Sequence, residues 1–597
     1  MIQSILMDSN ELRKKFLDFF EKKEHVIVPS SSLIPDDPSV LLTSAGMQQF
    51  KPYFTGEVDP VRDFGSRKAA SIQKAFRTSD IEEVGDESHL TFFEMLGHFS
   101  FGDYFKKETI EYTYALLTEV FRISRDRISV TVFEGDKSIP LDQESLDNWS
   151  RFLPSGKITR GKREDNVWGP VGSEGPCGAA NEIYVDGLEV ATLVFMEYYC
   201  VSDKSLKPLI QKGVDVGWGF ERLVMILQNK KTIFETDLFE PLLKLLPAEL
   251  FEARKRIIVD HIRAASFLIS DGVRPLNKEA GYILRRILRR IIAYEKTESI
   301  PWDVLKDICK KIISFYQSVY PELLKEEKNI INVIELEREM FQKTLSIGLK
   351  KFDILAKKYP IEISKEIPIK ESFDLYQSYG MTKDIILEEL AKRGRCCDEQ
   401  ELRKFEEDFE KEFKKHQEKS RAGLEKKFGG HGLVLDTGEL KAGDKEEENK
   451  VIRLHTATHL FHSALRKVLG EEVKQAGSDI NSKRARFDFT FNRKVNKEEL
   501  QQVEDIANEI IEKDYEVTCE EMPYEQALKT EALHFFKEKY PEKVKVYSVI
   551  DRKTKDVFSK ELCGGPHVSH TAEIGRLKIL KEESTAAGVR RIKINVL

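Results

Sequence analysis

The sequence predicts an α+β fold that begins with an antiparallel sheet. Helical and strand-like patterns mix without regular alternation through about residue 235, which disfavours a doubly wound parallel sheet. The chain then becomes helical from about residue 236 to 395, and a second mixed α/β region runs from Val451 to the C-terminus. At 597 residues the chain is too long for one hydrophobic core, so we expect several domains.

The composition is typical of a folded globular protein, with 41% apolar, 10% aromatic and 33% charged residues. The net charge of -7 is small for this length, so a nucleic-acid partner would have to bind a local basic surface. The seven cysteines are scattered and odd in number, which does not predict a disulfide framework. No stretch approaches the roughly 18 apolar residues of a membrane span, and the apolar N-terminal stretch is too short for a signal peptide. We therefore expect a cytoplasmic protein without a membrane partner.

The first predicted helix covers residues 10–23, because Leu12, Phe16, Phe19 and Phe20 share one helical face. Four strand-like runs follow it, at residues 25–30, 39–44, 127–134 and 193–199.

A charge-dense stretch at residues 398–429 has Phe405, Phe409 and Phe413 spaced by four. This pattern predicts a solvated helix with one apolar stripe. The glycine-rich and charged segment at 429–450 predicts turns or a linker.

Two patches in the first 235 residues are typical of a nucleotide site. In the first, Arg77 precedes a polar loop and Phe93 follows it. An arginine on one strand of a hairpin can clamp a phosphate and a carboxylate, and an aromatic on the return strand can stack on adenine. In the second, Gly217 and Gly219 allow close approach to the backbone, and Arg222 begins a helix. Each patch alone is weak, and the sequence contains no P-loop.

A third group of residues has the spacing of metal ligands. His455 and His459 lie one helical turn apart in HTATH, and Cys563 and His567 have the same spacing in CGGPH. Three imidazole nitrogens and one sulfur suit tetrahedral Zn²⁺.

Spacing leaves alternatives to this ligand set open. His462 and His570 lie nearby and could replace a ligand, and a buried histidine pair beside an unrelated turn would show the same pattern. Spacing also does not distinguish a structural zinc from a catalytic one.

Together these motifs resemble the alanyl-tRNA synthetases, a family of class II aminoacyl-tRNA synthetases, over nearly the whole chain. The similar segments occur in the family's order, as FFEMLGHFSFGDYF, Trp168 with GPCGAANEIY, VDVGWGFERL, DHIRAASFLISDGV, HTATHLFHSALR, and CGGPH with AAGVRRI. The resemblance implies a catalytic domain at 1–235 with the class II antiparallel sheet and flanking helices. It also implies a helical tRNA-recognition domain at 236–430 and an α/β zinc-containing editing domain at 431–597.

The resemblance implies that ATP and L-alanine form alanyl-adenylate and that alanine then passes to tRNA(Ala). Arg77 matches the arginine that holds the carboxylate and the α-phosphate, Arg222 matches a second ATP-binding arginine, and Asp215 matches the acid that pairs with the ammonium of alanine. The other implied ATP-binding residues are His89, Phe93, Gly217 and Gly219. The remaining implied alanine-binding residues are Met47, Trp168, Thr192 and Val194. Mg²⁺ is expected with ATP, but the sequence assigns no ligands to it.

A small apolar pocket discriminates against serine only about a hundredfold, so the family hydrolyses Ser-tRNA(Ala) and Gly-tRNA(Ala) at a second site. The zinc ligands of that site match the four His and Cys residues above, and Gln475 matches a glutamine implicated in serine selectivity. For tRNA(Ala), Asn277 and Asp384 match a pair that reads the G·U base pair of the acceptor stem. The helix at RRILRR carries the expected basic residues Arg285, Arg286, Arg289 and Arg290, a pattern that also fits solvated or carboxylate-paired arginines.

Three differences separate the chain from the family pattern. The loop between Arg77 and Val84 is shorter than in many relatives, and Thr192 stands where the family often has asparagine. The β-barrel before the editing domain and the C-terminal region of long forms are missing.

Three rival interpretations fit the sequence less well. A threonyl-tRNA synthetase places editing before catalysis and binds zinc in its synthetic site. A free-standing editing hydrolase does not account for the first 400 residues. A non-catalytic RNA-binding relative does not account for the presence of Arg77, Asp215 and Arg222 together.

We predict a monomer, because the region that supports dimerisation in long forms is missing. Analytical ultracentrifugation at micromolar concentration is expected to show one species of 68.9 kDa. A stable dimer would contradict this prediction.

Overall fold

The computed structural model describes residues 7–37, 40–172, 174–360, 367–395, 399–425, 445–530, 532–533, 543–586 and 588–597. Contacts group the chain into two compact units. Unit 1 consists of Met1–Val273 and Asn277–Ile331, and unit 2 of Arg274–Leu276 and Asn332–Leu597. No helix in these ranges is both long and apolar enough to cross a membrane.

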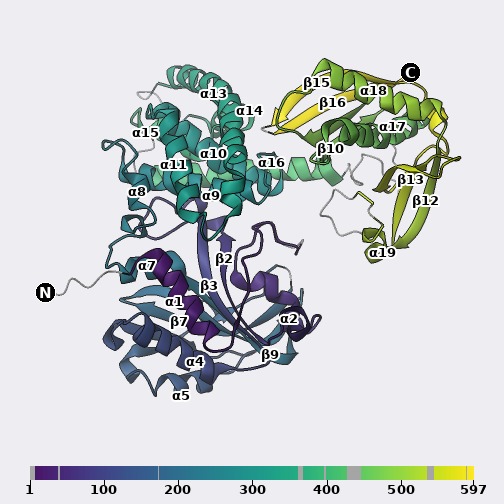
Figure 1. Ribbon diagram of the computed structural model, residues 1–597. Helices are drawn as coiled ribbons and strands as arrows, with labels where there is room; N and C mark the ends of the chain where they lie inside the picture. Colours follow the sequence, from purple (N-terminus) through teal and green to yellow (C-terminus); the bar gives the residue numbers. More distant parts are fainter. Residues whose placement is uncertain are drawn as a thin grey trace. The chain divides into compact units, whose positions relative to one another are not determined.

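Unit 1 is built on a nine-stranded sheet (Figure 1). The strand order is β1-β2-β3-β9-β8-β7-β4-β5, with β6 paired to β7. Among the described strands, two edge pairs are parallel, β1–β2 and β4–β5, and the others are antiparallel, which confirms the predicted fold class. The strands are β1 (Val26–Ile27), β2 (Lys68–Phe76), β3 (Phe92–Phe101), β4 (Ile128–Phe133), β5 (Ile158–Gly161), β6 (Val167–Trp168), β7 (Gly175–Val185), β8 (Leu188–Cys200) and β9 (Leu206–Gly219).

The first predicted helix is confirmed as α1 (Ser9–Glu21), which buries Leu12, Phe16 and Phe20. The Asp8 carboxylate caps it by accepting the Glu11 amide at 2.8 Å. The helices within the sheet region are α1, α2 (Lys51–Thr55), α3 (Pro60–Phe64), α4 (Lys106–Ala115), α5 (Gln143–Trp149), α6 (Arg163–Asn166) and α7 (Phe220–Leu227).

Two of the four predicted strands are confirmed, since residues 127–134 coincide with β4 and residues 193–199 lie within β8. The run at 25–30 contributes only the short β1. The strand predicted at 39–44 is wrong for its described residues, which are irregular. There Thr43 makes isolated backbone hydrogen bonds, to Leu33 at 2.9 Å and from Phe76 at 2.8 Å, in place of a strand ladder.

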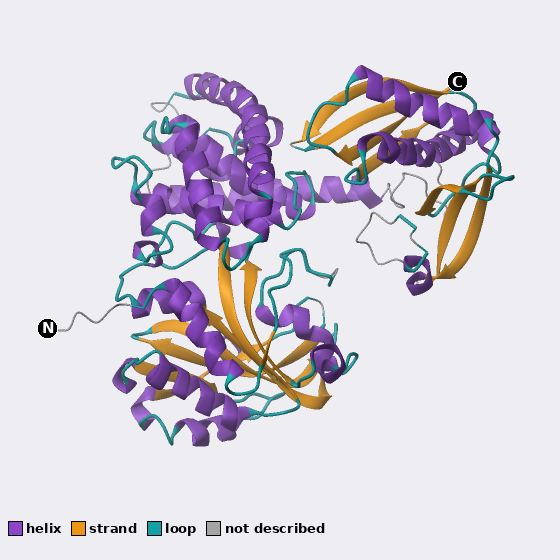
Figure 2. Ribbon diagram, in the orientation of Figure 1, coloured by secondary structure: helices purple, strands orange, loops and turns teal. Residues whose placement is uncertain are grey.

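The predicted helical region is confirmed (Figure 2). It contains α8 (Glu240–Leu243), α9 (Glu252–Ser270), α10 (Glu279–Thr297), α11 (Trp302–Tyr316), α12 (Glu322–Lys325), α13 (Glu327–Lys358), α14 (Ile369–Tyr379), α15 (Lys383–Ala391) and α16 (Glu399–Glu425). The apolar stripe predicted for α16 is also confirmed, because Phe409 packs 5.3 Å from the Phe373 ring of α14. The predicted boundary between residues 430 and 431 and most of the predicted linker lie outside the described residues.

The C-terminal part of unit 2 contains two antiparallel sheets, ordered β10-β11-β16-β15 and β12-β13-β14. Helix α17 packs against the first sheet and against α18 around a core that includes Phe461, Phe487 and Ile592. The elements are α17 (Lys445–Leu469), β10 (Gln475–Asn481), β11 (Arg484–Thr490), α18 (Lys497–Glu512), β12 (Glu516–Pro523), α19 (Tyr524–Leu528), β13 (Lys543–Ile550), β14 (Val557–Leu562), β15 (Leu577–Ala586) and β16 (Val589–Val596).

Four buried charges join α1, β3, α7 and α9 inside unit 1. Arg13 of α1 donates to both carboxylate oxygens of Glu94, at 2.9 and 2.5 Å. Arg263 of α9 pairs with Glu221 of α7, and the Glu94 amide donates to the Glu221 carboxylate at 3.2 Å. The Tyr320 hydroxyl donates to Glu94 at 3.0 Å. Each of these charged residues is at most 5% exposed, so each depends on its partners for compensation of its lost hydration.

Replacing Arg13 by methionine is expected to lower the free energy of unfolding by about 3–5 kcal/mol, because it leaves Glu94 with less charge compensation. The matched control is Lys15→Met on the same helix, where Lys15 pairs with Glu11 at the surface at 2.8 Å. The control is expected to cost about 1 kcal/mol or less. Urea unfolding followed by circular dichroism measures both variants, and equal losses would contradict the prediction.

Candidate active site and metal centre

One face of the unit 1 sheet carries several residues predicted to activate alanine. Strand register places one row across β3, β9, β8 and β7, consisting of Phe99, Asp215, Val194 and Ala180. The next row consists of Gly97, Gly217, Thr192 and Glu182. Residues two apart along a strand project to the same face, so both rows share one surface.

Arg77 and Phe93 extend this surface at the β2–β3 hairpin. Ala75 pairs with Phe93 in the strand register, and Arg77, two residues later, shares their face. The Arg77 amide donates to the Thr91 carbonyl at 3.0 Å, and its guanidinium lies 5.0 Å from the centroid of the Phe93 ring. The hairpin therefore places a cation and an aromatic side by side, as the sequence predicts.

Arg222 lies in the first turn of α7, directly after β9. Its guanidinium donates to the Glu189 carbonyl at 3.0 Å and contacts the Glu189 carboxylate at 3.2 Å. The pKa of Arg77 is lowered by burial and by repulsion from Arg222, against the opposing effects of Asp80 and Glu189. Two guanidinium groups that repel each other would both be stabilised by a polyanion such as a phosphate chain.

Asp215 is buried at 5% exposure in the middle of β9. Burial raises the pKa of its carboxyl to about 7, and no described group pairs with that carboxyl. Its cross-strand neighbour Val194 belongs to an apolar cluster with Met47, and Trp168 packs against that cluster. A buried unpaired carboxylate beside a small apolar cluster fits a small ligand that carries an ammonium group.

Gly217 and Gly219 of β9 have different surroundings. A Cβ on Gly217 would lie 2.9 Å from the sulfur of Met95, a flexible side chain that would have to shift. A Cβ on Gly219 would lie 3.5 Å from Cδ of Arg222, which is ordinary contact.

The carboxylates of Glu182 and Glu189 lie on this surface, and the sequence reasoning missed them. Thr192 stands directly across from Glu182 and donates to Glu189 at 3.2 Å. The pKa of Glu182 is raised by burial and by repulsion from Glu189, although a hydrogen bond from Tyr184 lowers it. These two carboxylates, beside Arg222, offer oxygen donors of the kind that Mg²⁺ prefers. The sequence could have indicated that these two carboxylates lie close together, because they stand on the two strands of a tight hairpin.

The loop between β2 and β3 is held by the helices of unit 1. Arg256 of α9 donates to the carbonyls of Gly85 at 3.2 Å and Asp86 at 2.7 Å. Asp86 in turn contacts Nδ1 of His89 at 2.5 Å, which holds this predicted ATP-binding residue against the loop. The Thr91 hydroxyl donates to Asp260 of α9 at 2.6 Å.

The four predicted tRNA-binding arginines of α10 differ in exposure. Arg285 and Arg290 are buried, where Arg285 donates to Asn277 and Arg290 donates to the carbonyl of Ile81 at 2.9 Å. Arg286 pairs with Glu82 and is half-buried, as is Arg289. Two of the four arginines therefore pack inside unit 1. Asp384 lies in α15, and its side chain is outside the described residues.

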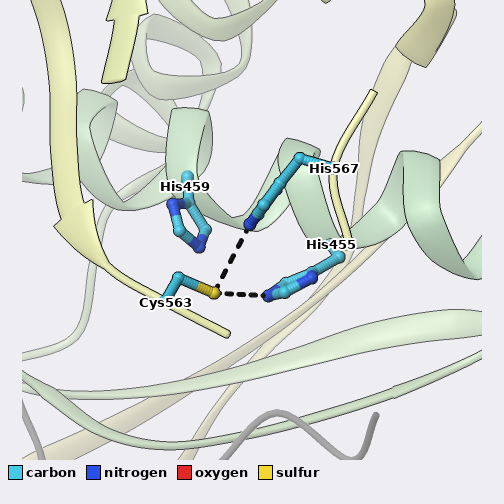
Figure 3. A group of neighbouring side chains, drawn as sticks. All are labelled: His455, His459, Cys563 and His567. Carbon is cyan, nitrogen blue, oxygen red and sulfur yellow. Dashed lines mark hydrogen bonds between the residues drawn. The ribbon is translucent and has the colours of Figure 1, made fainter. Parts of the chain in front are cut away.

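The four predicted metal ligands meet in unit 2 (Figure 3). Figure 3 shows the side chains of His455 and His459, both from helix α17, together with those of Cys563 and His567, pointing toward one another. The sulfur of Cys563 lies 3.3 Å from Nε2 of His455 and 3.4 Å from Nε2 of His567, and all four ligand atoms lie within 4.8 Å of one another. Zinc bonds of about 2.3 Å to sulfur and about 2.0 Å to nitrogen separate the two donors by about 3.5 Å in a tetrahedron. The donor set and its spacing therefore fit Zn²⁺.

The Nδ1 atoms of the ligand histidines are held by neighbouring groups. Nδ1 of His455 contacts the Pro566 carbonyl at 3.0 Å, and Nδ1 of His567 contacts the Thr456 hydroxyl at 3.1 Å. Nδ1 of His459 lies 3.5 Å from the Glu561 carboxylate. Such contacts orient imidazoles so that Nε2 would face a bound metal ion.

Burial keeps the isolated ligands neutral. It raises the pKa of the Cys563 thiol to about 12 and lowers the pKa of His459. The lowered pKa leaves the His459 imidazole neutral and able to bind a metal, whereas a metal ion would have to displace the proton of the Cys563 thiol.

The alternative ligands lie outside this group. Nδ1 of His462 contacts Glu561 at 2.9 Å, and His570 precedes the short helical turn at residues 571–574. Gln475 begins β10 and is 9% exposed, and its side-chain Nε2 has no hydrogen-bond partner among the described residues.

Comparisons with known proteins agree with this geometry. The family model for class II (A) tRNA synthetases matches residues 11–469, and the model for the second additional domain of threonyl and alanyl tRNA synthetases matches residues 544–593. An alanine–tRNA ligase of Treponema pallidum is 40% identical, with 99% of this chain and 98% of the relative aligned. One of Borrelia hermsii is also 40% identical, with 98% and 99% aligned, and one of Thermotoga maritima is 36% identical, with 98% and 80% aligned.

A solved structure of a pyrrolysyl-tRNA synthetase from Desulfitobacterium hafniense aligns with 38% of this chain and 71% of its own at 13% identity, with a TM-score of 0.24. The family models match more than half of this chain, and the relatives align over nearly all of it. The chain therefore belongs to the alanine–tRNA ligase family of class II aminoacyl-tRNA synthetases.

Proposed function

We propose that this protein attaches L-alanine to tRNA(Ala) at the expense of ATP and hydrolyses Ser-tRNA(Ala) and Gly-tRNA(Ala) at a zinc site. The observation that carries the first activity is the single sheet face that combines Arg77, Arg222 and buried Asp215. The proposed regions are 1–235 for aminoacylation, 236–430 for tRNA recognition and 431–597 for editing.

The first step joins alanine to the α-phosphorus of ATP. Asp215 binds the ammonium of alanine, while Arg77 binds both the alanine carboxylate and the α-phosphate. The carboxylate oxygen then attacks the phosphorus, and pyrophosphate leaves. Arg77 and Arg222 compensate the negative charge on the phosphates, so positioning and electrostatics replace a protein nucleophile.

The nucleotide is held by residues around the same face. Phe93 stacks on adenine, His89 and the Gly217–Gly219 stretch complete the ATP site, and Arg222 anchors the phosphate chain. Glu182 and Glu189 would hold Mg²⁺, which neutralises phosphate charge and orients pyrophosphate as a leaving group.

The side-chain pocket is formed by Met47, Trp168 and Val194, with Thr192 at its polar edge. These walls exclude larger amino acids by volume, but glycine fits and serine adds only one hydroxyl. The second site is therefore needed. There His455, His459, Cys563 and His567 would hold Zn²⁺, which supplies Lewis-acid chemistry or binds the aminoacyl end, and Gln475 offers a buried amide for serine.

Transfer RNA would meet the helical region. Arg286 and Arg289 are the better exposed arginines of α10 and supply phosphate contacts, while Arg285 and Arg290 support the fold. Asn277 and Asp384 would read the G·U base pair of the acceptor stem.

Alanine-dependent exchange between ATP and pyrophosphate is expected in folded protein. Asp215→Asn should abolish it by removing the charge that binds the ammonium, while Asp186→Asn at the exposed β7–β8 turn should leave it intact. Absence of exchange in the wild-type protein would overturn the proposal.

The pKa of Asp215 predicts a pH dependence of alanine binding. Alanine binds the ionised carboxylate, so its KM is expected to rise about tenfold between pH 8 and pH 6, as protonation begins near pH 7. The buried charge also costs stability as pH rises from about 4 to 7, so Asp215→Asn should unfold at a higher temperature than wild type at pH 8 and at the same temperature at pH 4. A KM that does not change between these pH values would contradict the assignment.

Replacing Cys563 by alanine removes one of the four zinc ligands. Deacylation of Ser-tRNA(Ala) is expected to fall at least about a hundredfold, while alanine-dependent exchange stays within about twofold of wild type. Radiolabelled aminoacyl-tRNA hydrolysis measures the first activity. An equal loss of both activities would show that the zinc site serves folding instead.

A further inference from the structure

We infer that Glu561 is a positioning residue of the metal centre, which selects the nitrogen by which His459 binds zinc. Glu561 lies near the end of β14, two residues before Cys563, and is 3% exposed. Its two carboxylate oxygens contact two different histidines of α17. Oε2 lies 3.5 Å from Nδ1 of His459, and Oε1 lies 2.9 Å from Nδ1 of His462. The inference rests on the proposed zinc site.

The contact with Glu561 determines the tautomer of His459. A carboxylate accepts hydrogen bonds, so it favours a proton on the nearby Nδ1 and leaves the lone pair on Nε2. Nε2 is the nitrogen that reaches the ligand group, as it is in His455 and His567. Without Glu561, His459 would populate the tautomer with its lone pair directed away from the metal.

Packing of His462 in the domain core explains why His459, and not His462, belongs to the ligand group. The two residues are three apart on α17, so spacing permits either to bind. Glu561 engages Nδ1 of both rings, with the shorter contact to His462. His462 also packs against Phe487, with ring centroids 5.2 Å apart, which places it in the domain core.

Charge compensation is a second reason for a carboxylate at position 561. Zinc bound to one thiolate and three neutral imidazoles carries a net charge of +1 in a buried environment. Glu561 brings a compensating negative charge beside the ligand His459. A carboxylate in this position strengthens metal binding without contacting the metal.

The test compares zinc affinities of full-length variants by competition with a chromophoric chelator. Glu561→Gln keeps the shape of the side chain but removes its charge, and its zinc affinity is expected to fall about 10- to 100-fold. The matched control is Glu504→Gln, which alters a buried carboxylate of α18 that accepts from Lys578 at 2.7 Å and from the Ile579 amide at 2.8 Å. The control is expected to bind zinc as tightly as wild type.

Deacylation activity is an independent measurement on the same variants. Deacylation of Ser-tRNA(Ala) by Glu561→Gln should be low when zinc is limiting and recover when zinc is in excess, while alanine-dependent exchange is unchanged. If wild-type protein binds zinc but hydrolyses no Ser-tRNA(Ala), the editing proposal fails, and the zinc affinities still decide the role of Glu561.

Three results would overturn the inference. The first is a zinc affinity of Glu561→Gln within twofold of wild type, and the second is an equal loss in Glu504→Gln. Should Glu561→Gln not fold, Glu561→Asp keeps the charge on a shorter side chain and is expected to lose less than tenfold in zinc affinity. The third overturning result is therefore a loss of zinc affinity above a hundredfold in a folded Glu561→Asp.

Discussion

The buried ion network around Glu94 and Glu221 is the constraint on which unit 1 depends. Glu94 follows Phe93 on β3, and Glu221 precedes Arg222 on α7. Because neighbouring strand residues face opposite ways, Glu94 points away from the surface that carries Phe93. Arg13 and Arg263 bind these two carboxylates from behind the sheet. Phe93 and Arg222 are therefore held in place by their sequence neighbours Glu94 and Glu221, whose side chains are buried and fixed by ion pairs.

Carboxylates in unit 1 have two kinds of surroundings. Glu94 receives two bonds from a guanidinium and one from a tyrosine, which offset the cost of its burial. Asp215 is almost as deeply buried on the adjacent strand, but no described group pairs with it, and its pKa rises to about 7. The fold thus leaves the Asp215 carboxyl without a compensating charge among the described residues, and the proposed ammonium of alanine would supply that charge. Within one sheet, Glu94 is therefore a carboxylate that stabilises the fold, and Asp215 is a carboxylate proposed to bind a ligand.

The candidate metal centre of unit 2 also depends on partners held by the fold. Its ligands come from a helix and from a loop 108 residues further along the chain. Each ligand histidine has its Nδ1 beside a fixed acceptor, from Pro566, Thr456 or Glu561. Two of these acceptors flank Cys563 in sequence, so the segment that provides the sulfur also orients the imidazoles of α17. A site assembled in this way forms only when both segments have packed.

The local spacing of residues in the sequence determined several elements of the fold and of the candidate metal site. The spacing of Phe16 and Phe20 predicts α1, the absence of strand–helix alternation predicts the antiparallel sheet, and the two four-residue spacings predict the ligand group, because side-chain periodicity follows from backbone geometry. Whether Arg285 and Arg290 face solvent, and whether His459 or His462 joins the ligands, was decided only by tertiary structure. The same holds for the repulsion between Glu182 and Glu189, and for the lack of a described partner for the Asp215 carboxyl. These outcomes depend on contacts between strands and helices that are distant in sequence. Those contacts determine which side chains are buried, which charges are compensated and which histidine tautomer is favoured.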